Sequence, residues 1–149
     1  MGLTDCERQY MVKLRMDKSI RFLEEARQMV GMKLWDLAAN RFYYSCFHAA
    51  QALLLEYGFS AHTHEGTLSL FGLHFVKTKI VDVSLGSFFS RMEQLRKKAD
   101  YNCNYDVSEE EVATMIEPAN CFVSTISELL YSNKKNNSDS LCNYSAVGA

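Results

Sequence analysis

Proline and glycine are scarce in this sequence, with one proline and seven glycines among its 149 residues. Hairpins and tight turns depend on these two residue types, so their scarcity disfavours a sheet and favours long helices. The chain also lacks an apolar run of the roughly 18 residues that a membrane-spanning helix needs. Its first residues, which include Asp5 and Glu7, lack the basic-then-apolar order of a secretion signal. These absences predict a soluble, cytoplasmic protein with no membrane partner.

An excess of either charge is missing as well, because 16 basic side chains are matched by 18 acidic ones. A net charge of -2 gives no global attraction to nucleic acid or to an anionic membrane, so any such contact must be local. The five cysteines are an odd number and contain no CxxC pair. This pattern favours free thiols in a reducing compartment over a disulfide framework.

Apolar residues, in contrast, make up 48% of the chain, and they recur at steps of three and four. Such steps place side chains on one face of a helix. Gly31 and Gly58 stand where the first two of these patterns would end. We therefore predict a single all-α helical bundle. Its helices are expected over about residues 4–30, 33–57, 67–77, 85–101 and 108–131.

The same spacing predicts which side chains form the core. Met16, Ile20 and Leu23 share a stripe on the first helix, and Leu95 and Ala99 continue a stripe on the fourth. The second helix is apolar on most of its sides. We therefore expect it at the centre of the bundle.

The last helix has a clear start and an internal break. Ser108 followed by Glu111 is a capping box, which begins a helix. Pro118 removes a backbone donor, so we expect a kink there. The apolar period then stops, which predicts one domain over residues 1–131 and a mobile tail over residues 132–149.

Two of the predicted helices carry polar faces that core packing does not explain. These faces consist of Arg41, Tyr44 and His48 on the second helix, and of Arg96, Asp100 and Tyr101 at the end of the fourth. Spacings of three and four place the first three side chains together, and Asp100 one turn after Arg96. If the two helices pack antiparallel, an arginine–aspartate network joined by tyrosine and histidine side chains would lie between them or face a partner subunit.

Three interpretations of these faces are open. The simplest is a structural network in which Arg96 and Asp100 form an ordinary helical ion pair. In the second, Arg96 holds a phosphate or phosphodiester, His48 or Tyr101 supplies a proton-transfer or hydrogen-bonding group, and Asp100 orients them. In the third, the residues serve only an interface.

Two weaker signals have simpler explanations. His62 and His64 fall in the main loop without a third metal ligand in view, so a solvated loop is favoured over a metal site. Lys97 and Lys98 extend a basic turn that would meet phosphate. A solvated helix end is the simpler explanation, because positive side chains near the C-terminus of a helix interact favourably with the negative pole of the helix dipole.

Three segments together resemble the HEPN (higher eukaryote and prokaryote nucleotide-binding) family, most closely its small stand-alone prokaryotic members. They are residues 39–50 (ANRFYYSCFHAA), residues 63–66 (THEG) followed by 70–76 (LFGLHFV), and residues 96–101 (RKKADY). The resemblance covers roughly residues 10–131. It rests on all three segments in this order, since no single one would suffice.

The resemblance implies an up-and-down bundle of four or five helices, often a homodimer. Such proteins are commonly partners of a small nucleotidyltransferase, in several cases as toxin and antitoxin. Ribonuclease members carry an arginine, four to six further residues and a histidine, and paired subunits bring two such motifs together over RNA. In this sequence Tyr101 stands where that histidine would follow Arg96. A phenol is a poor general base at neutral pH, so this departure weakens the expectation of RNA cleavage.

In some members of the family the nucleotidyltransferase adenylylates a tyrosine two residues after the motif histidine. Cys103 occupies that position here. Tyr101 or Tyr105 would have to take its place.

Together, these arguments predict a HEPN-type binding or interaction module that forms a homodimer and is the partner of a small nucleotidyltransferase, with nucleotide or RNA phosphate as a further ligand. Catalysis is not assumed. The ligand-binding residues would be Arg41, Tyr44, Arg96 and Lys97. The alternative is a metal-independent endoribonuclease toxin. Its catalytic residues would be Arg96, Asp100 and Tyr101, with His48 from the neighbouring helix. Neither alternative calls for a metal or a cofactor.

Overall fold

The structure is a computed structural model that describes residues 2–132. Its long helices are α1 (Asp5–Gly31), α2 (Trp35–Glu56), α4 (Val83–Tyr101) and α6 (Ile116–Tyr131). Its short elements are α3 (His64–Phe71), the π-helical turn η1 (Gly72–Val76) and α5 (Glu109–Ala113). Residues 2–132 contain no strand, and the predicted all-α fold is confirmed. The predicted tail, apart from Ser132, lies outside the described residues.

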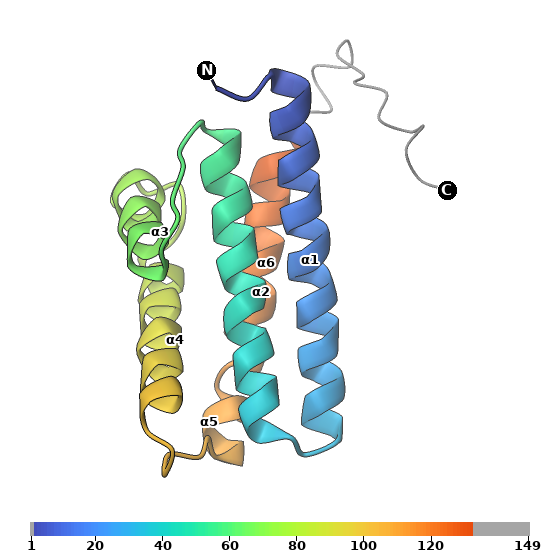
Figure 1. Cartoon of the computed structure of the whole chain (residues 1–149), viewed down its shortest axis with the longest axis vertical. Helices are drawn as coiled ribbons and strands as arrows, with labels where there is room; N and C mark the ends of the chain where they lie inside the picture. Colours follow the sequence, from blue (N-terminus) through green and yellow to red (C-terminus); the bar gives the residue numbers. More distant parts are fainter. Residues whose placement is uncertain (1, 133–149) are drawn as a thin grey trace.

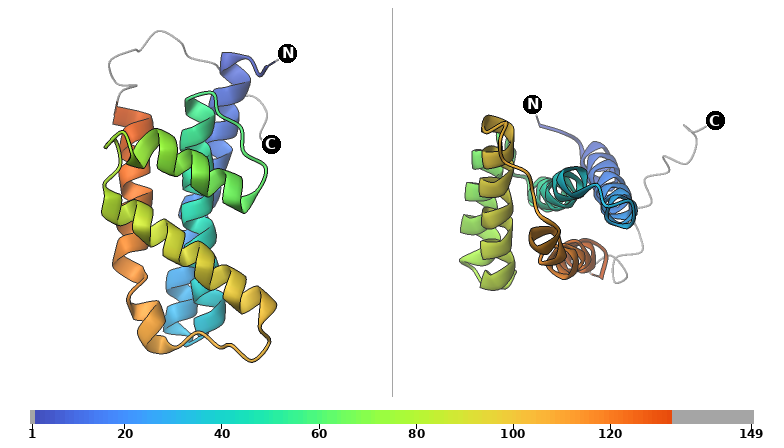
Figure 2. Two further views of the ribbon diagram at one scale, coloured as in Figure 1. Left: turned by 90° about the vertical axis from the view of Figure 1, so that its left-hand side faces the viewer. Right: turned by 90° about the horizontal axis from the view of Figure 1, so that it is seen from below.

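The four long helices alternate in direction along the bundle (Figure 1). In that view α1 runs downward, α2 returns upward, α4 runs downward on the other side of α2, and α6 returns upward. Seen from below, α1, α2 and α6 lie together, and α3 and α4 form a separate layer beside α2 (Figure 2). This is an up-and-down bundle with two short helices inserted in its connections.

The second helix is the centre of the bundle, as its apolar character predicts. It contacts all five other α-helices, and 14 of its 22 residues are buried. Ala38, Ala49 and Ala52 are fully buried. Such small side chains allow neighbouring helices to approach α2 closely, and the larger rings of Phe42 and Phe47 fill the remaining space. Polar side chains on α2 consequently have few routes to water.

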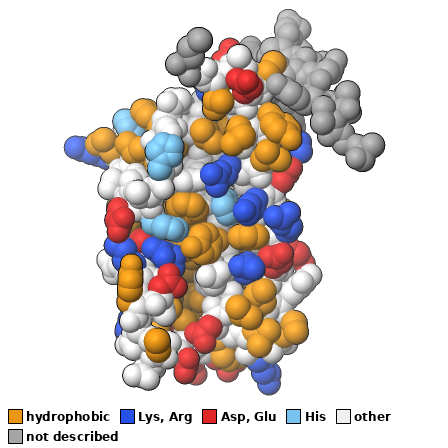
Figure 3. Space-filling view, viewed as in Figure 1, with side chains coloured by type: hydrophobic (Ala, Val, Ile, Leu, Met, Phe, Trp, Pro, Cys, Tyr) orange, Lys and Arg blue, Asp and Glu red, His pale blue; other side chains and the backbone are white. Residues whose placement is uncertain are grey.

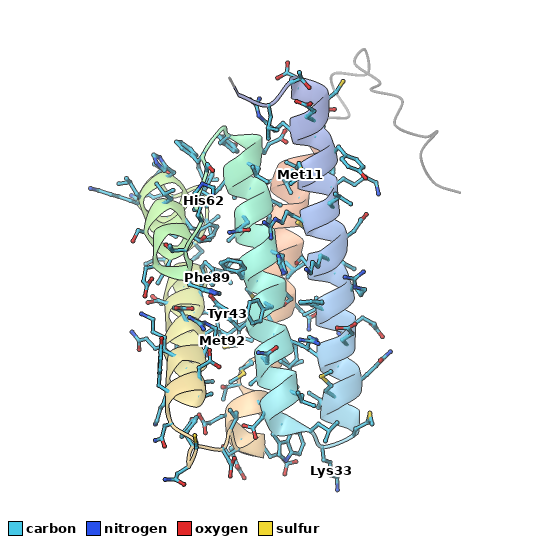
Figure 4. The ribbon with its side chains drawn as sticks, viewed as in Figure 1. Met11, Lys33, Tyr43, His62, Phe89 and Met92 are labelled. Carbon is cyan, nitrogen blue, oxygen red and sulfur yellow. The ribbon has the colours of Figure 1, made fainter. Side chains whose placement is uncertain are left out.

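A cluster of aromatic rings holds α4 in place. Phe89 of α4 lies 5.6 Å from Phe71 of α3 and 5.2 Å from Phe122 of α6, measured between ring centroids. Tyr43 of α2 stacks on Phe89 at 6.2 Å. Figure 4 shows Tyr43 pointing from α2 toward Phe89 and Met92 of α4. Aromatic pairs of this kind add about 0.5–1.5 kcal/mol each beyond their burial. They fix the position of the α4 segment that carries the candidate site.

Two predicted core positions are wrong. Ile20 is 51% exposed, because α1 packs through a neighbouring stripe of buried residues instead. That stripe consists of Val12, Met16, Ser19, Leu23 and Ala26. Ala99 is exposed because the last turns of α4 border a hollow rather than another helix. Helical spacing predicts which residues share a face. It does not predict over what length of that face a neighbouring helix is in contact.

The third predicted helix begins earlier than expected. It starts at His64, because the hydroxyl of Thr63 accepts a hydrogen bond from the backbone N–H of Gly66 at 2.9 Å and caps the helix. It continues as the π-helical turn η1 to Val76, next to the predicted end at Lys77. As a result, His64 belongs to a helix and not to the preceding loop.

The last predicted helix is broken, but not at the proline. The capping box at Ser108 and Glu111 is present and starts α5, which ends before Thr114. A new helix, α6, then begins at Ile116 and contains Pro118 in its first turn. The expected kink at Pro118 is therefore wrong. A proline in the first turn lacks an N–H that would have no partner within the helix anyway.

We expect Pro118→Ala to change the free energy of unfolding by less than about 1 kcal/mol, because no helical hydrogen bond is gained or lost. Ser124→Pro, at an exposed position inside the same helix, should cost about 3 kcal/mol or more. Urea unfolding followed by circular dichroism measures both values. Equal losses in the two variants would show that Pro118 does not lie in the first turn.

Candidate functional site

Polar side chains of α1, α2, α3 and α4 form two clusters on one face of the bundle. The Arg96 cluster consists of Tyr43, His64, Glu93, Arg96 and Asp100. The His48 cluster consists of Arg15, Lys18, Arg21, Phe22 and His48. Figure 3 shows this face, with basic and histidine side chains around a central group of apolar ones. Tyr44 joins the clusters, with its ring centroid 5.9 Å from that of His64 and 6.2 Å from that of His48.

In the Arg96 cluster the guanidinium group is held by two carboxylates of its own helix. Its Nε and Nη2 atoms donate to the two oxygens of Glu93, each at 3.0 Å. Its Nη1 atom donates to Asp100 at 2.7 Å. Glu93 lies one turn before Arg96 and Asp100 one turn after it, so the spacing on α4 produces both pairs. Glu93 is 3% exposed and the side chain of Arg96 is 15% exposed, so most of this pair is removed from water.

The α2 and α3 side of this cluster is a tyrosine–histidine pair. The hydroxyl of Tyr43 lies 2.6 Å from Nδ1 of His64, which is a short hydrogen bond. Nδ1 of His64 also lies 3.9 Å from a carboxylate oxygen of Glu93. The guanidinium carbon of Arg96 lies 5.6 Å from the ring centroid of Tyr43. One connected network therefore joins α2, α3 and α4.

The environment fixes the protonation of these groups. Burial raises the pKa of Tyr43 well above its ordinary value, and its contact with Glu93 raises it further. Burial alone would raise the pKa of Glu93, but hydrogen bonds from Arg96 and Tyr43 outweigh it and lower the pKa. Burial, followed by the charge of Arg96, lowers the pKa of His64. At neutral pH the cluster therefore holds a protonated phenol, an ionised carboxylate and a neutral imidazole.

A hollow of about 390 Å³ lies beside Arg96, between the start of α2, the end of α4 and the segment that leads to α5. Apolar side chains such as Leu37 and Met92 line part of it, and Asn40, Arg96 and Asp100 supply polar groups. This combination of apolar wall and few polar groups is typical of a site for a small ligand or for a side chain of a partner.

The His48 cluster is built around a buried imidazole. His48 is 6% exposed, and its Nδ1 atom lies 3.0 Å from Nη1 of Arg15. Because arginine can only donate, Nδ1 of His48 accepts, and the proton of the neutral ring lies on Nε2. Burial, and then the charges of Arg15, Lys18 and Arg21, lower the pKa of His48 to about 4. The cluster therefore holds three cations around a neutral histidine.

Arg41 belongs to the edge of this second cluster. It pairs with Glu25 of α1 at 2.9 Å and lies 4.7 Å from the ring centroid of Phe22. Lys97, a predicted ligand-binding residue, pairs with Glu65 of α3 at 2.7 Å. Both cations therefore already have carboxylate partners within the chain.

The structure brings some of the predicted residues together and separates others. Arg96 and Asp100 meet as predicted, but His48 lies in the other cluster. Tyr101 is 86% exposed, on a different side of α4 from Arg96. Tyr43 and His64 take the places in the network that were expected for Tyr101 and His48.

Sequence reasoning missed Tyr43, His64 and Glu93. Tyr43 precedes Tyr44 by one residue, which rotates it about 100° around α2 toward α4. The sequence pattern places His64 in a loop, because a helix start at Thr63 depends on a cap that apolar spacing does not reveal. The available signal for Glu93 was its place among the apolar residues of α4, three positions before Arg96.

Residues 2–132 contain no group of three metal-binding side chains, and His62 lies against the hydroxyl of Ser60 at 3.3 Å. Cys46, Cys103 and Cys121 carry free thiols, as the cysteine pattern predicts, but Cys6 is disulfide-bonded, so the prediction of free thiols is wrong for Cys6. None of the described helices is both long and apolar enough to cross a membrane.

One known family matches most of the chain. A family model described as the HEPN domain matches residues 12–129. The chain belongs to the HEPN family. The predicted resemblance is thus confirmed.

Several relatives of this HEPN protein match over most of their length. It is 37% identical over 108 residues to a UPF0332 protein of Thermotoga maritima, which covers 72% of this chain and 82% of the relative. It is 35% identical over 108 residues to a Methanocaldococcus jannaschii protein named "Putative toxin MJ0605", with 72% and 80% covered. A UPF0332 protein of Archaeoglobus fulgidus is 29% identical over 123 residues, with 83% and 98% covered. The similarity therefore covers about three quarters or more of this chain and is not limited to a single motif.

We expect Arg96→Met to lower the free energy of unfolding by about 3 kcal/mol at pH 7, because it leaves the carboxylate of Glu93 buried without its cation. The pKa of Glu93 is lowered in the folded protein, so the pair stabilises the fold above the usual glutamate range and this contribution is lost as the pH falls through the folded pKa. The difference between variant and wild type should therefore narrow at pH 4.

Urea unfolding at pH 7 and at pH 4 measures this difference. Arg91→Met is the control, because Arg91 is exposed on the same helix and should change stability by only about 0.5 kcal/mol. A loss for Arg96→Met that is no larger than that of the control would contradict the buried pair.

We further expect His48 to remain neutral between pH 5.5 and pH 8, because its pKa of about 4 lies below this range. The ring protons of His48, followed by NMR, should not shift within it. Arg15→Gln should raise the pKa of His48, since it removes one of the surrounding charges. A midpoint at the ordinary histidine value of about 6.5 in the wild type would contradict the burial of this ring.

Proposed function

We propose that this HEPN protein is a toxin-type module that acts by binding, as the partner of a small nucleotidyltransferase, and that it does not cleave RNA through residues 96–101. The observation that carries the proposal is the state of Arg96. Its guanidinium group is neutralised by Glu93 and Asp100, which together bring two negative charges to its one. A phosphate approaching Arg96 would meet a net negative cluster.

The geometry around Tyr101 supports the same conclusion. The nuclease motif of the family needs a histidine near its arginine, whereas Tyr101 is not a histidine and lies on a different side of α4 from Arg96. With 86% exposure, its side chain is instead available to a partner protein. The hollow beside Arg96, which Asp100 and Asn102 line, offers room for a partner side chain.

The toxin character is supported by the relative named as a toxin, which is similar over most of both chains. That name applies to the relative. For this chain we propose a role in a toxin–antitoxin pair. The nucleotidyltransferase would be the antitoxin, and the toxin would be a homodimer.

One observation favours the alternative, a metal-independent endoribonuclease toxin. The imidazole of His64 is partly exposed and lies 3.9 Å from Glu93, which in turn holds Arg96. His64 of α3 thus lies near Arg96, and the sequence after Arg96 lacks the histidine of the nuclease motif. In that alternative His64, with an Nδ1 atom bound by Tyr43, would be the proton-transfer group.

Two measurements test the proposal. The purified full chain, incubated with end-labelled single-stranded RNA and EDTA, should leave the RNA intact. The same chain, co-expressed with a small nucleotidyltransferase encoded beside it, should elute with that protein from a size-exclusion column, and exposed-surface variants such as Tyr101→Ala should weaken the complex about tenfold or more. Ser124→Ala, exposed on α6, serves as a matched control for the complex.

The proposal is overturned by EDTA-resistant cleavage that is lost in His64→Gln and in Asp100→Asn while both variants unfold at the wild-type temperature. That result would establish the ribonuclease alternative. If neither a complex nor cleavage is found, the binding proposal is wrong as well.

A further inference from the structure

A half-buried cation of α1 has no negative partner. Arg15 forms no ion pair within residues 2–132, whereas Lys13 and Arg27 of the same helix pair with carboxylates at 2.8 and 3.3 Å. Its guanidinium group lies 3.0 Å from Nδ1 of His48, but this neutral ring cannot balance the charge. Charged side chains that leave water are normally paired. The fold therefore leaves one partly buried positive charge without a counterion.

The neighbouring cations of α1 are in a different position. Lys18 and Arg21 form no ion pair within the described residues either, but both are exposed, so water screens their charge. Arg15 is further removed from water, and its burial lowers the pKa of its guanidinium group. The need for a negative partner therefore falls on Arg15.

A cavity of about 180 Å³ lies beside Arg15, between α1, α2 and the segment that joins α2 to α3. Its other polar side chains are those of Gln51, Ser60 and His62. Figure 4 shows Met11 on α1 and His62 on the joining segment, on either side of the upper part of α2. At about 30 Å³ for each water molecule, the volume corresponds to about six waters, which is the size of a small organic molecule. The apolar wall of the cavity consists of Met11, Leu54, Leu55, Phe59 and Ala61.

Contacts of the joining segment hold the wall of this cavity in place. The ring of Phe59 stacks on that of His74 in η1, with centroids 3.9 Å apart. The side-chain nitrogen of Gln51 donates to the hydroxyl of Thr67 at 3.3 Å and to the carbonyl of Ala61 at 3.4 Å. Because these groups are already ordered, a ligand that enters the cavity has little ordering to impose, which favours its binding.

We propose that this cavity, which we call the Arg15 site, binds a small organic monocarboxylate with a short apolar tail. The guanidinium group of Arg15 presents parallel N–H groups that match the two oxygens of a carboxylate, and its contact with His48 fixes its direction. The tail lies against Leu54 and Phe59. The Arg15 site does not include Arg96 or the hollow beside it, and it does not rest on the proposed function.

Other anions fit the Arg15 site less well. A phosphate group carries about two negative charges at pH 7 and three oxygens that need donors, whereas this cavity offers one cation and a mostly apolar wall. An acidic side chain of a partner protein brings the same carboxylate. It has only one or two methylene groups, so it would leave more of the apolar wall uncovered.

The test is an NMR titration of the isotope-labelled full chain with sodium hexanoate at neutral pH and physiological salt. We expect shifts of the backbone amides of residues 55–62 and a Kd of about 1 mM or lower, which is within reach of a ligand of this size. Hexanol has the same tail without the charge and should bind about tenfold or more weakly. Inorganic phosphate has charge without a tail and should not displace hexanoate at an equal concentration.

Met11→Glu is the sharpest variant, because it supplies a counterion from within the chain. Met11 is 37% exposed, lines the cavity and lies one turn before Arg15. An acidic residue four positions before a basic one on a helix pairs with it favourably. The introduced carboxylate should therefore occupy Arg15 and raise the Kd of hexanoate about tenfold or more. Met11→Gln, the matched control of the same shape without the charge, should change the Kd by less than about threefold.

Two further variants separate Arg15 from the general charge of α1. Arg15→Gln should raise the Kd about tenfold or more, and its fold is checked by circular dichroism, since glutamine can still donate to His48. Lys18→Gln/Arg21→Gln removes two charges that do not line the cavity and should raise the Kd less than about twofold. Equal weakening by these two variants would show that only the net charge of α1 matters and would overturn the site.

The Arg15 site is also overturned if hexanoate does not bind the wild type, if hexanol binds as tightly, or if Met11→Glu binds hexanoate as well as Met11→Gln does. Displacement of hexanoate by an equal concentration of phosphate would assign the cavity to phosphate and overturn the proposed ligand class. Tighter binding of N-acetylglutamate amide would assign it to an acidic side chain of a partner protein, with the same consequence. None of these measurements involves the nucleotidyltransferase or RNA, so failure of the proposed function would leave this inference in place.

Discussion

The enclosure of α2 is the constraint on which the rest of the structure depends. Every other α-helix contacts it, so its buried polar side chains are removed from water and need hydrogen-bond partners inside the protein. Tyr43 forms a hydrogen bond with His64, and His48 forms one with Arg15. Each pairing brings a second helix to a defined position. The polar groups of α2 therefore determine where functional side chains of α1, α3 and α4 lie.

The two clusters that result differ in charge. In the first, one arginine faces two carboxylates, and the network is closed by hydrogen bonds across three helices. In the second, three cations surround an imidazole that remains neutral, and they have no carboxylate partner within residues 2–132. A closed, net negative cluster holds the helices together, whereas an open, positive one attracts an anion. Charges of opposite sign are thus separated on one face of the bundle.

The sequence was sufficient to predict the helices and their order, because apolar spacing and caps are local signals. The central place of α2 followed from its apolar surface, and the pair of Arg96 with Asp100 followed from spacing on one helix. The partners of Arg96 on other helices could not be predicted in this way. Tyr43 and Tyr44 differ only by a rotation around α2, and nothing local says which of them faces α4. The position of His64 depends on the cap at Thr63, a residue in a polar segment that the sequence pattern predicts as a loop.

The buried pair also bears on what membership of the HEPN family implies for activity. An arginine can assist RNA cleavage only if its charge is available to the phosphate. Freeing Arg96 means breaking its contact with Glu93, at a cost of about 3 kcal/mol for a buried pair. That cost corresponds to a factor of about 100 in an equilibrium constant. A substrate bound by one chain would have to supply this energy at a cluster that repels it. A partner that contributes its own cation to Glu93 would lower the cost, so any activity of Arg96 is tied to what the protein binds.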